Sequence, residues 1–160
     1  MRVTSAGELI AALCSPAADA AQVLAEGVPQ HAGIVSQLAR AALGSPAIQH
    51  AAARPHWRET YVGTVIGDRV LEGFIDLIYR DDGLVIVDYK TDTVPGAAVD
   101  QRAAFYRPQL AAYATALHAA TQEPITQCIL IFLSPAGAVE RPVDGIDEAA
   151  TLVRDAVLSG

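Results

Sequence analysis

Three charged side chains interrupt two otherwise apolar segments in the middle of this chain. The first segment is Gly73-Phe74-Ile75-Asp76-Leu77-Ile78-Tyr79 and the second is Val85-Ile86-Val87-Asp88-Tyr89-Lys90-Thr91-Asp92. Burying an unpaired charge in such surroundings costs roughly several kcal/mol. A chain that carries two carboxylates and a lysine there is expected to use them, and the carboxylates favour a divalent cation.

A short turn is predicted to join two strands in this region. Residues 70–80 and 84–90 have the apolar patterns of strands, and Asp81-Asp82-Gly83 lies between them. This segment suits a three-residue hairpin loop with the glycine in the left-handed position. Such a loop pairs Arg80 with Leu84 and thereby fixes the register of both strands.

The predicted register places Asp76 directly across from Asp88. Side chains alternate between the faces of a sheet, so Asp88 and Lys90 share one face. Two carboxylates roughly 5 Å apart repel each other unless a cation lies between them. Mg²⁺ or Mn²⁺ is the expected occupant because both prefer oxygen ligands. The simpler alternative is that each aspartate caps a turn or pairs with a nearby lysine.

A third segment adds a helical motif, Gln109-Leu110-Ala111-Ala112-Tyr113. With Gly-Phe-Ile-Asp at 73–76 and Asp-Tyr-Lys-Thr at 88–91, it resembles the RecB-type nuclease domain of the PD-(D/E)xK superfamily. That domain is the C-terminal domain of RecB/AddAB/AdnAB-like helicase–nucleases. The resemblance covers about residues 57–135, with the motifs in the order of the family.

The resemblance implies a role for each motif residue. Asp76, Asp88 and the backbone carbonyl of Tyr89 are implied to ligate the metal, and Lys90 is implied to position or activate the attacking water. Gln109 and Tyr113 match a further pair of the family near the site. They lie four residues apart, so they form one patch of a helix.

One expected metal ligand has no obvious counterpart. The family usually supplies a His or Glu from a helix well before the strands, whereas residues 6–13 contain no histidine. Glu8, Glu26 and His31 are alternative substitutes, or the ligand precedes Met1. The chain is then either a domain excised from a longer protein or a subunit with weakened metal binding.

The remaining pattern predicts an α/β fold with a restriction-endonuclease-like core. Residues 1–54 are assigned to an N-terminal helical segment and residues 55–160 to the nuclease core. Strands are expected at 58–66, 70–80, 84–90 and 128–133, with helices at about 105–120 and from about Asp147. The strands form a mixed sheet, a β-meander followed by a helix and a strand, flanked by helices. Pro108 is placed in the first turn of its helix, where a missing N–H is harmless.

The charge of the chain limits what it does alone. The formal net charge is −7, which argues against an autonomous nucleic-acid-binding domain. Arg107 is a candidate for contacting phosphate near Gln109, and the alternative is an ordinary solvated charge. No phosphate-binding loop of the P-loop type, signal peptide or membrane-spanning run is evident, so a cytoplasmic protein is expected.

Three functions are compatible with the sequence. The first is a Mg²⁺-dependent deoxyribonuclease of the exodeoxyribonuclease V kind, in which Mn²⁺ substitutes. It would cut single-stranded DNA delivered by a helicase during double-strand-break repair, the helicase body being in the same polypeptide or complex. The second is a metal-poor or inactive nuclease fold that guides DNA in a helicase complex. The third is an unrelated α/β binding domain.

Overall fold

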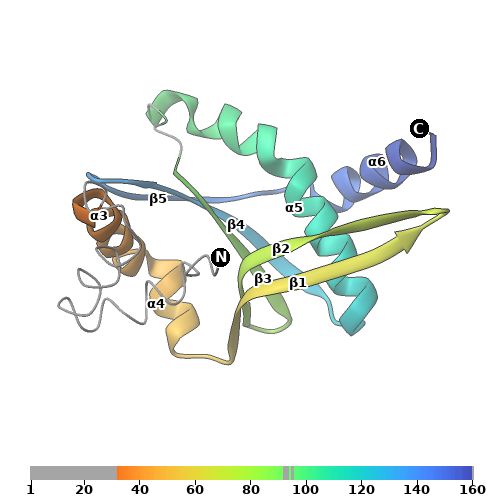
Figure 1. Cartoon of the computed structure of the whole chain (residues 1–160), viewed down its shortest axis with the longest axis horizontal. Helices are drawn as coiled ribbons and strands as arrows, with labels where there is room; N and C mark the ends of the chain where they lie inside the picture. The colour runs from red at the N-terminus through yellow and green to blue at the C-terminus, as the bar shows by residue number, and fades with distance from the viewer. Residues whose placement is uncertain (1–31, 92–93, 95, 160) are drawn as a thin grey trace.

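A computed structural model describes residues 32–91, 94 and 96–159 of the chain. Two short helices precede a meander of three strands, and a long helix leads to two more strands and a final helix (Figure 1). The elements are α3 (Ala32–Leu43), α4 (Pro46–Ala52), β1 (His56–Ile66), β2 (Arg69–Arg80), β3 (Leu84–Lys90), η2 (Gly96–Ala98), α5 (Val99–Thr121), β4 (Ile125–Ser134), β5 (Gly137–Pro142) and α6 (Ile146–Ser159).

Within the described residues, five strands form one mixed sheet in the order β1-β2-β3-β4-β5. Neighbouring strands are antiparallel except for β3 and β4, which are parallel. A parallel pair needs a crossover connection, and α5 provides it. The predicted α/β architecture is confirmed, but β5 was not predicted. Its sequence carries a proline, an arginine and a glutamate, which hide an edge strand from a search for apolar runs.

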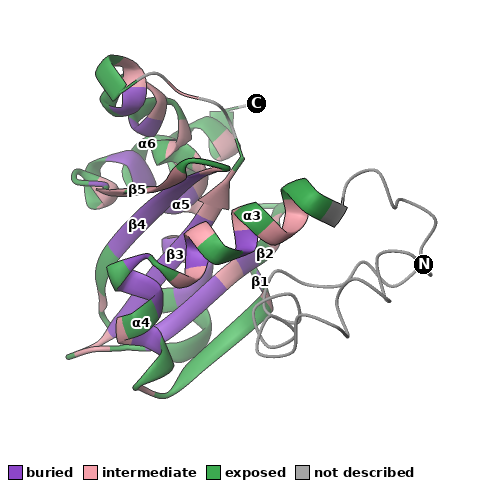
Figure 2. Ribbon diagram, turned by 90° about the vertical axis from the view of Figure 1, so that its left-hand side faces the viewer, coloured by how far each residue is buried: buried purple, intermediate pink, exposed green. Residues whose placement is uncertain are grey.

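Helices cover both faces of the sheet. On one face, α5 contributes Leu110, Ala114 and Leu117 to a core that includes Ile86 of β3 and Leu130 of β4. On the other face, α3 and α4 pack on a second set of sheet residues: Leu77, Tyr79, Val85, Val87, Ile129, Ile131 and Leu133. The central strands β3 and β4 are therefore buried from both sides, as Figure 2 shows by their purple colour.

The long helix begins earlier than the sequence predicted. It starts at Val99, so Pro108 lies inside α5 and not in its first turn. Burial stabilises the first turns of α5, because Val99 and Ala103 are both part of the core. A proline inside a helix removes one backbone hydrogen bond, and packing of the flanking turns must offset that loss.

The turn between β2 and β3 has the predicted length but a different backbone. Arg80 pairs with Leu84, as expected for a three-residue loop. The left-handed residue is Asp82, with φ 52°, whereas Gly83 has φ 147°. Aspartate is one of the few L-residues that tolerate the left-handed conformation, and glycine is needed for the more extreme φ that follows.

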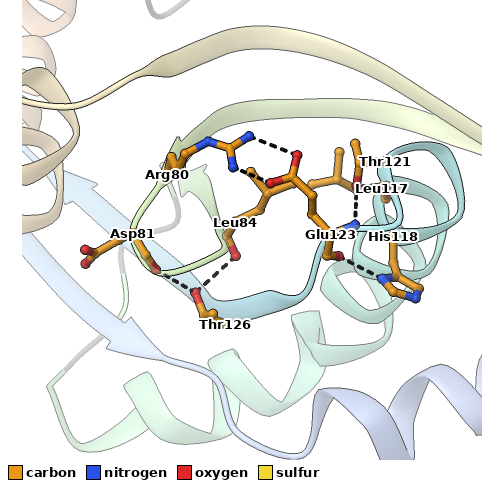
Figure 3. Close-up of polar contacts among 8 residues, drawn as sticks. All are labelled: Arg80, Asp81, Leu84, Leu117, His118, Thr121, Glu123 and Thr126. Atoms are coloured by element: carbon orange, nitrogen blue, oxygen red, sulfur yellow. Dashed lines mark hydrogen bonds and ion pairs between the residues drawn. The ribbon is translucent and has the colours of Figure 1, made fainter.

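Contacts from the α5–β4 connection hold this turn in place (Figure 3). The Arg80 guanidinium donates two hydrogen bonds to the Glu123 carboxylate. The hydroxyl of Thr126 donates to the carbonyls of Asp81 and Leu84 at 3.3 Å each. The end of the β2–β3 hairpin is therefore anchored to the start of β4.

Replacing Gly83 with alanine tests the anchoring of this turn. A Cβ atom at Gly83 would lie 2.5 Å from Thr126 Cγ2 and 2.8 Å from the Pro124 carbonyl oxygen. We expect Gly83→Ala to lower the free energy of unfolding by roughly 2–3 kcal/mol, from backbone strain and steric overlap together. Denaturant unfolding followed by circular dichroism measures it.

Gly137→Ala is the matched control. Gly137 has nearly the same φ, 146°, but nothing lies within 4 Å of the position that its Cβ atom would occupy. In Gly137→Ala, the free energy of unfolding should fall only by the contribution of backbone strain, roughly 1 kcal/mol. Equal losses in the two variants would show that the contacts with Thr126 and Pro124 do not restrict the turn.

Candidate active site

The candidate site lies where β2 and β3 separate. The antiparallel ladder runs in the predicted register from Arg80↔Leu84 to Leu77↔Val87, and the next pair in that register is Asp76 and Asp88. Instead of backbone pairing there, the Tyr89 N–H donates a hydrogen bond of 2.7 Å to Asp76 Oδ2. A side chain thus takes the place of a carbonyl in the ladder and holds the first carboxylate beside β3.

Side-chain alternation is interrupted at the same position. Ile75 and Ile78 both belong to the core under α5, although they are three residues apart, and Leu77 belongs to the core on the other face. Strict alternation forbids that arrangement. The residue opposite Asp76 on β1 is Glu59, whose φ is 49° within an otherwise regular ladder. The regular strand geometry is therefore interrupted by a kink at the Glu59 and Asp76 positions of β1 and β2.

Asp88 and Lys90 form an ion pair at the end of β3. The distance from Lys90 Nζ to Asp88 Oδ2 is 2.6 Å, and the side chains are 14% and 4% exposed. Among the described residues, Asp88 Oδ2 has no partner in hydrogen-bond geometry, so the lysine neutralises it without a well-directed bond. The predicted placement of Lys90 beside Asp88 is thus present in the structure.

Helix α5 supplies the next contacts of the lysine. Lys90 Nζ donates to Gln109 Oε1 at 2.9 Å, and Gln109 Nε2 donates to the Tyr113 hydroxyl at 2.8 Å. The Tyr113 ring packs against β2 at Gly73, where a Cβ atom would lie only 2.7 Å from Tyr113 Cε1. The structure therefore joins the three sequence motifs into one set of contacts.

Arg107 has a different environment from the other predicted residues. It is exposed on α5 and does not take part in the hydrogen bonds that link Lys90, Gln109 and Tyr113 in the described part of the chain. Its proposed contact with DNA stays a prediction.

The two carboxyl groups both have raised pKa values. Burial raises the pKa of Asp76 to about 6, although the hydrogen bond from Tyr89 opposes the shift. The charges of Asp88 and Glu59 raise it further, and Lys90 lowers it. Burial also raises the pKa of Asp88, against the effect of Lys90. Without a cation, the site therefore favours taking up a proton.

The residues present fit part of a divalent metal site. Asp76 and Asp88 offer carboxylate oxygens. In the described part of the chain, Asp88 Oδ2 accepts no hydrogen bond, and its polar contact is the ion pair with Lys90. No group of three His, Cys, Asp or Glu side chains placed to hold a metal ion occurs within the described ranges. Glu8, Glu26 and His31, the alternatives for a further ligand, lie outside the described residues.

Three features of the site were not predicted. The Tyr106 ring lies under the Lys90 ammonium, 4.2 Å from Nζ to the ring centroid. The packing role of Gly73 could have been predicted from the sequence, because an isolated glycine in a strand often marks a place where another group approaches the backbone closely. The left-handed backbone of Glu59 could not have been predicted from the sequence, since glutamate rarely adopts that conformation.

A separate hollow of about 710 Å³ lies away from this site. It is lined by parts of α5, α6 and the start of β4, including His118, Cys128 and Asp147. None of the motif residues lines it, so it is not part of the candidate active site.

The helical crossover of the mixed sheet thus places a glutamine and a tyrosine next to Lys90. The model of the PD-(D/E)XK nuclease superfamily matches residues 2–157. The chain belongs to the PD-(D/E)XK nuclease superfamily. Members of this superfamily generally use divalent metal ions and act on DNA.

Two known proteins give the context of this match. The chain is 37% identical over 71 residues to an ATP-dependent helicase/nuclease subunit from Bacillus cytotoxicus, a match that covers 39% of this chain and 6% of that protein. A RecB-type relationship is consistent with this similarity. The crystal structure of SSO0001 is similar with a TM-score of 0.45 and 16% identity, over 96% of this chain and 74% of that one.

None of the described helices is long and apolar enough to cross a membrane.

Gly73→Ala tests the packing of α5 on β2. The added methyl group would displace the Tyr113 ring, and Tyr113 holds Gln109. We expect a loss of roughly 2 kcal/mol in the free energy of unfolding. Gly63→Ala is the control, because its Cβ would lie 3.1 Å from the hydroxyl of Tyr61, an exposed side chain on the surface of β1. Urea unfolding compares the variants, and equal stabilities would contradict this packing.

The raised pKa of Asp76 predicts a pH dependence for the metal-free protein. Its folded pKa, about 6, lies above the ordinary value of 3.8. The folded state therefore binds the proton more tightly, and this stabilisation, present below pH 4, is lost as pH rises through 6. Relative to Asp76→Asn, which keeps an acceptor for Tyr89, the wild type should lose up to roughly 3 kcal/mol between pH 4 and pH 7.

Asp155→Asn, at an exposed position of α6, controls for a general loss of negative charge. Thermal unfolding in chelator-treated buffer at several pH values provides the measurement. Parallel pH profiles for wild type and Asp76→Asn would show that Asp76 does not titrate in this range.

Proposed function

We propose that this chain is a metal-dependent nuclease domain that hydrolyses phosphodiester bonds in DNA. The observation that carries the proposal is the placement of Lys90, which Asp88 and Gln109 hold at the end of β3, next to the position of Asp76. An ammonium beside two carboxylates is a combination suited to phosphoryl chemistry, since the carboxylates bind cations and the ammonium stabilises developing negative charge. Membership of the PD-(D/E)XK nuclease superfamily supports it.

Asp76, Asp88 and the Tyr89 carbonyl are the proposed ligands of Mg²⁺, with Mn²⁺ as a substitute. The N–H and C=O of a strand residue point toward the same neighbour. Because the Tyr89 N–H points to Asp76, its carbonyl is also directed to the β2 side. A bound divalent cation would polarise the phosphate and lower the pKa of a ligated water.

Lys90 would orient the attacking water and stabilise negative charge on the phosphate oxygens. Its ammonium has three donors, and contacts with Asp88 and Gln109 leave part of this capacity for a substrate. Gln109 and Tyr113 restrict the lysine from the α5 side, so its donors stay directed along the end of β3.

The proposed substrate is single-stranded DNA supplied by a helicase body. The relative with a helicase/nuclease name is much longer, and this chain spans 6% of its length. The net charge of −7 disfavours independent capture of DNA. We therefore propose an exonuclease of the exodeoxyribonuclease V kind, acting with a helicase in the same polypeptide or complex during double-strand-break repair in the cytoplasm.

A second candidate is an inactive nuclease fold that guides DNA. The observation that favours it is that no third His, Cys, Asp or Glu in the described part of the chain is placed to hold a metal ion together with the two carboxylates. The two candidates differ in metal binding, because only the active nuclease requires a filled cation site. Titration calorimetry with Mn²⁺ separates them, using Asp76→Asn as the variant that should abolish the heat of binding.

A cleavage assay on single-stranded DNA tests the main proposal. We expect slow cleavage by this chain in Mg²⁺ and faster cleavage in Mn²⁺, which binds such ligands more tightly. Lys90→Ala should lower the rate by about 100-fold or more, because charge stabilisation in the transition state is lost. Joining the chain to a helicase body should increase cleavage by concentrating DNA at the site.

Two outcomes would contradict these expectations. Cleavage that survives Lys90→Ala would place the chemistry elsewhere in the chain. The absence of both metal binding and cleavage, under all conditions and with the helicase body present, would favour the DNA-guiding module.

A further inference from the structure

The chain contains one lysine among its 160 residues, and that lysine is in the candidate site. Its ammonium is surrounded on three sides: Asp88 Oδ2 lies at 2.6 Å, Gln109 Oε1 at 2.9 Å and the Tyr106 ring centroid at 4.2 Å. Two of these contacts belong to the motifs of the site. The ring of Tyr106 is the third, and it is the contact that the proposed function leaves without a role.

The Tyr106 ring is also held by contacts with Arg102 and Phe105. Arg102 donates a hydrogen bond of 3.0 Å from Nη2 to the Tyr106 hydroxyl. The Arg102 guanidinium also lies over the rings of Phe105 and Tyr106, at 4.6 Å and 4.9 Å from their centroids. The edge-to-face contact of Phe105 and Tyr106 adds a further restraint at 5.2 Å. The ring is thus a restrained surface under the ammonium.

We propose that Tyr106 is a positioning residue for Lys90 and that the face of its ring sets where the ammonium lies; this inference rests on the proposed nuclease function. A lysine has a flexible four-carbon stem and a compact charge. Asp88 and Gln109 hold the ammonium through polar contacts, and the Tyr106 ring restricts it from a third side. A ring face attracts the ammonium without using a carboxylate oxygen.

The position of Tyr106 in the chain is consistent with this role. It lies three residues before Gln109 on α5, so both side chains project from one face of the helix toward β3. Tyr106 is only partly buried, at the border of the core under α5. A residue that merely filled the core would be replaceable by any apolar side chain of similar volume. A residue that acts through its ring face would be replaceable only by another aromatic side chain.

That difference defines the variants. Tyr106→Phe keeps the ring and removes the hydroxyl that bonds Arg102, whereas Tyr106→Leu and Tyr106→Met keep apolar volume and remove the ring. Two non-aromatic variants are used so that one remains if the other does not fold. Tyr61→Leu is the matched control, because Tyr61 is a 55% exposed tyrosine on β1 that contacts Phe74 and Glu72. Circular dichroism verifies that each variant is folded.

The first measurement needs neither metal nor DNA. With ¹³C-lysine labelling, the single lysine gives one ε-CH₂ signal, which a ring face at 4.2 Å from Nζ should shift upfield. Wild type, Tyr106→Phe and Tyr61→Leu should keep the upfield shift and the restricted motion of this group. Both non-aromatic variants should lose the shift and show faster side-chain motion. Restricted Lys90 motion in both non-aromatic variants would overturn the proposal.

The second measurement is the cleavage of single-stranded DNA in Mn²⁺. A misplaced catalytic group lowers the rate of the chemical step, so kcat should fall about tenfold or more in the non-aromatic variants, with KM within about twofold of wild type. Tyr106→Phe should stay within about threefold of the wild-type kcat. An unchanged kcat in the non-aromatic variants, or an equal loss in Tyr106→Phe, would overturn the proposal.

The two measurements separate this proposal from the proposed function. If wild type cuts no DNA under any condition, the nuclease proposal fails for this chain. The lysine signal then still decides whether the Tyr106 ring positions Lys90. If wild type is active, both measurements must agree with the ring-dependent pattern.

Discussion

The hydrogen bond from the Tyr89 N–H to the Asp76 carboxylate is the contact on which the site depends. It replaces a backbone pairing at the point where β2 leaves β3, so the strands part without leaving that N–H unpaired. The open end of β3 then presents Asp88 and Lys90 next to Asp76. Burial of Asp76 raises the pKa of that group, and the hydrogen bond from Tyr89 partly offsets the rise.

The parallel pairing of β3 and β4 explains how α5 reaches this position. A crossover from the end of β3 must pass over the sheet before it returns to the start of β4. The first half of α5 consequently lies beside Lys90, and its Tyr106, Gln109 and Tyr113 side chains meet β3 and β2. The other end of the helix is tied to the β2–β3 turn through Glu123 and Arg80. Topology therefore brings the distant motifs together.

Structural features that depend on the local sequence, such as turns and apolar strands, were predictable. The turn at residues 81–83 fixed the register of β2 and β3, and apolar periodicity located most of the strands. Features that depend on tertiary contacts were not predictable in this way. The strand β5 is polar because it is an edge, α5 begins at Val99 because the core buries that turn, and the kink at Glu59 has no propensity signal. The simple alternation used to place Asp76 fails at this kink, although the register itself holds.

The distribution of positive charge has a consequence for how such a site meets DNA. The lysine is 14% exposed and already faces Asp88, so it contributes little to attraction at a distance. Positive charge elsewhere in the chain comes from arginines, and acidic residues outnumber basic ones by 18 to 11. Long-range attraction to a phosphate backbone must then come from bound cations or from another part of a larger assembly. Such a division is consistent with the proposed function, in which a larger assembly delivers the DNA.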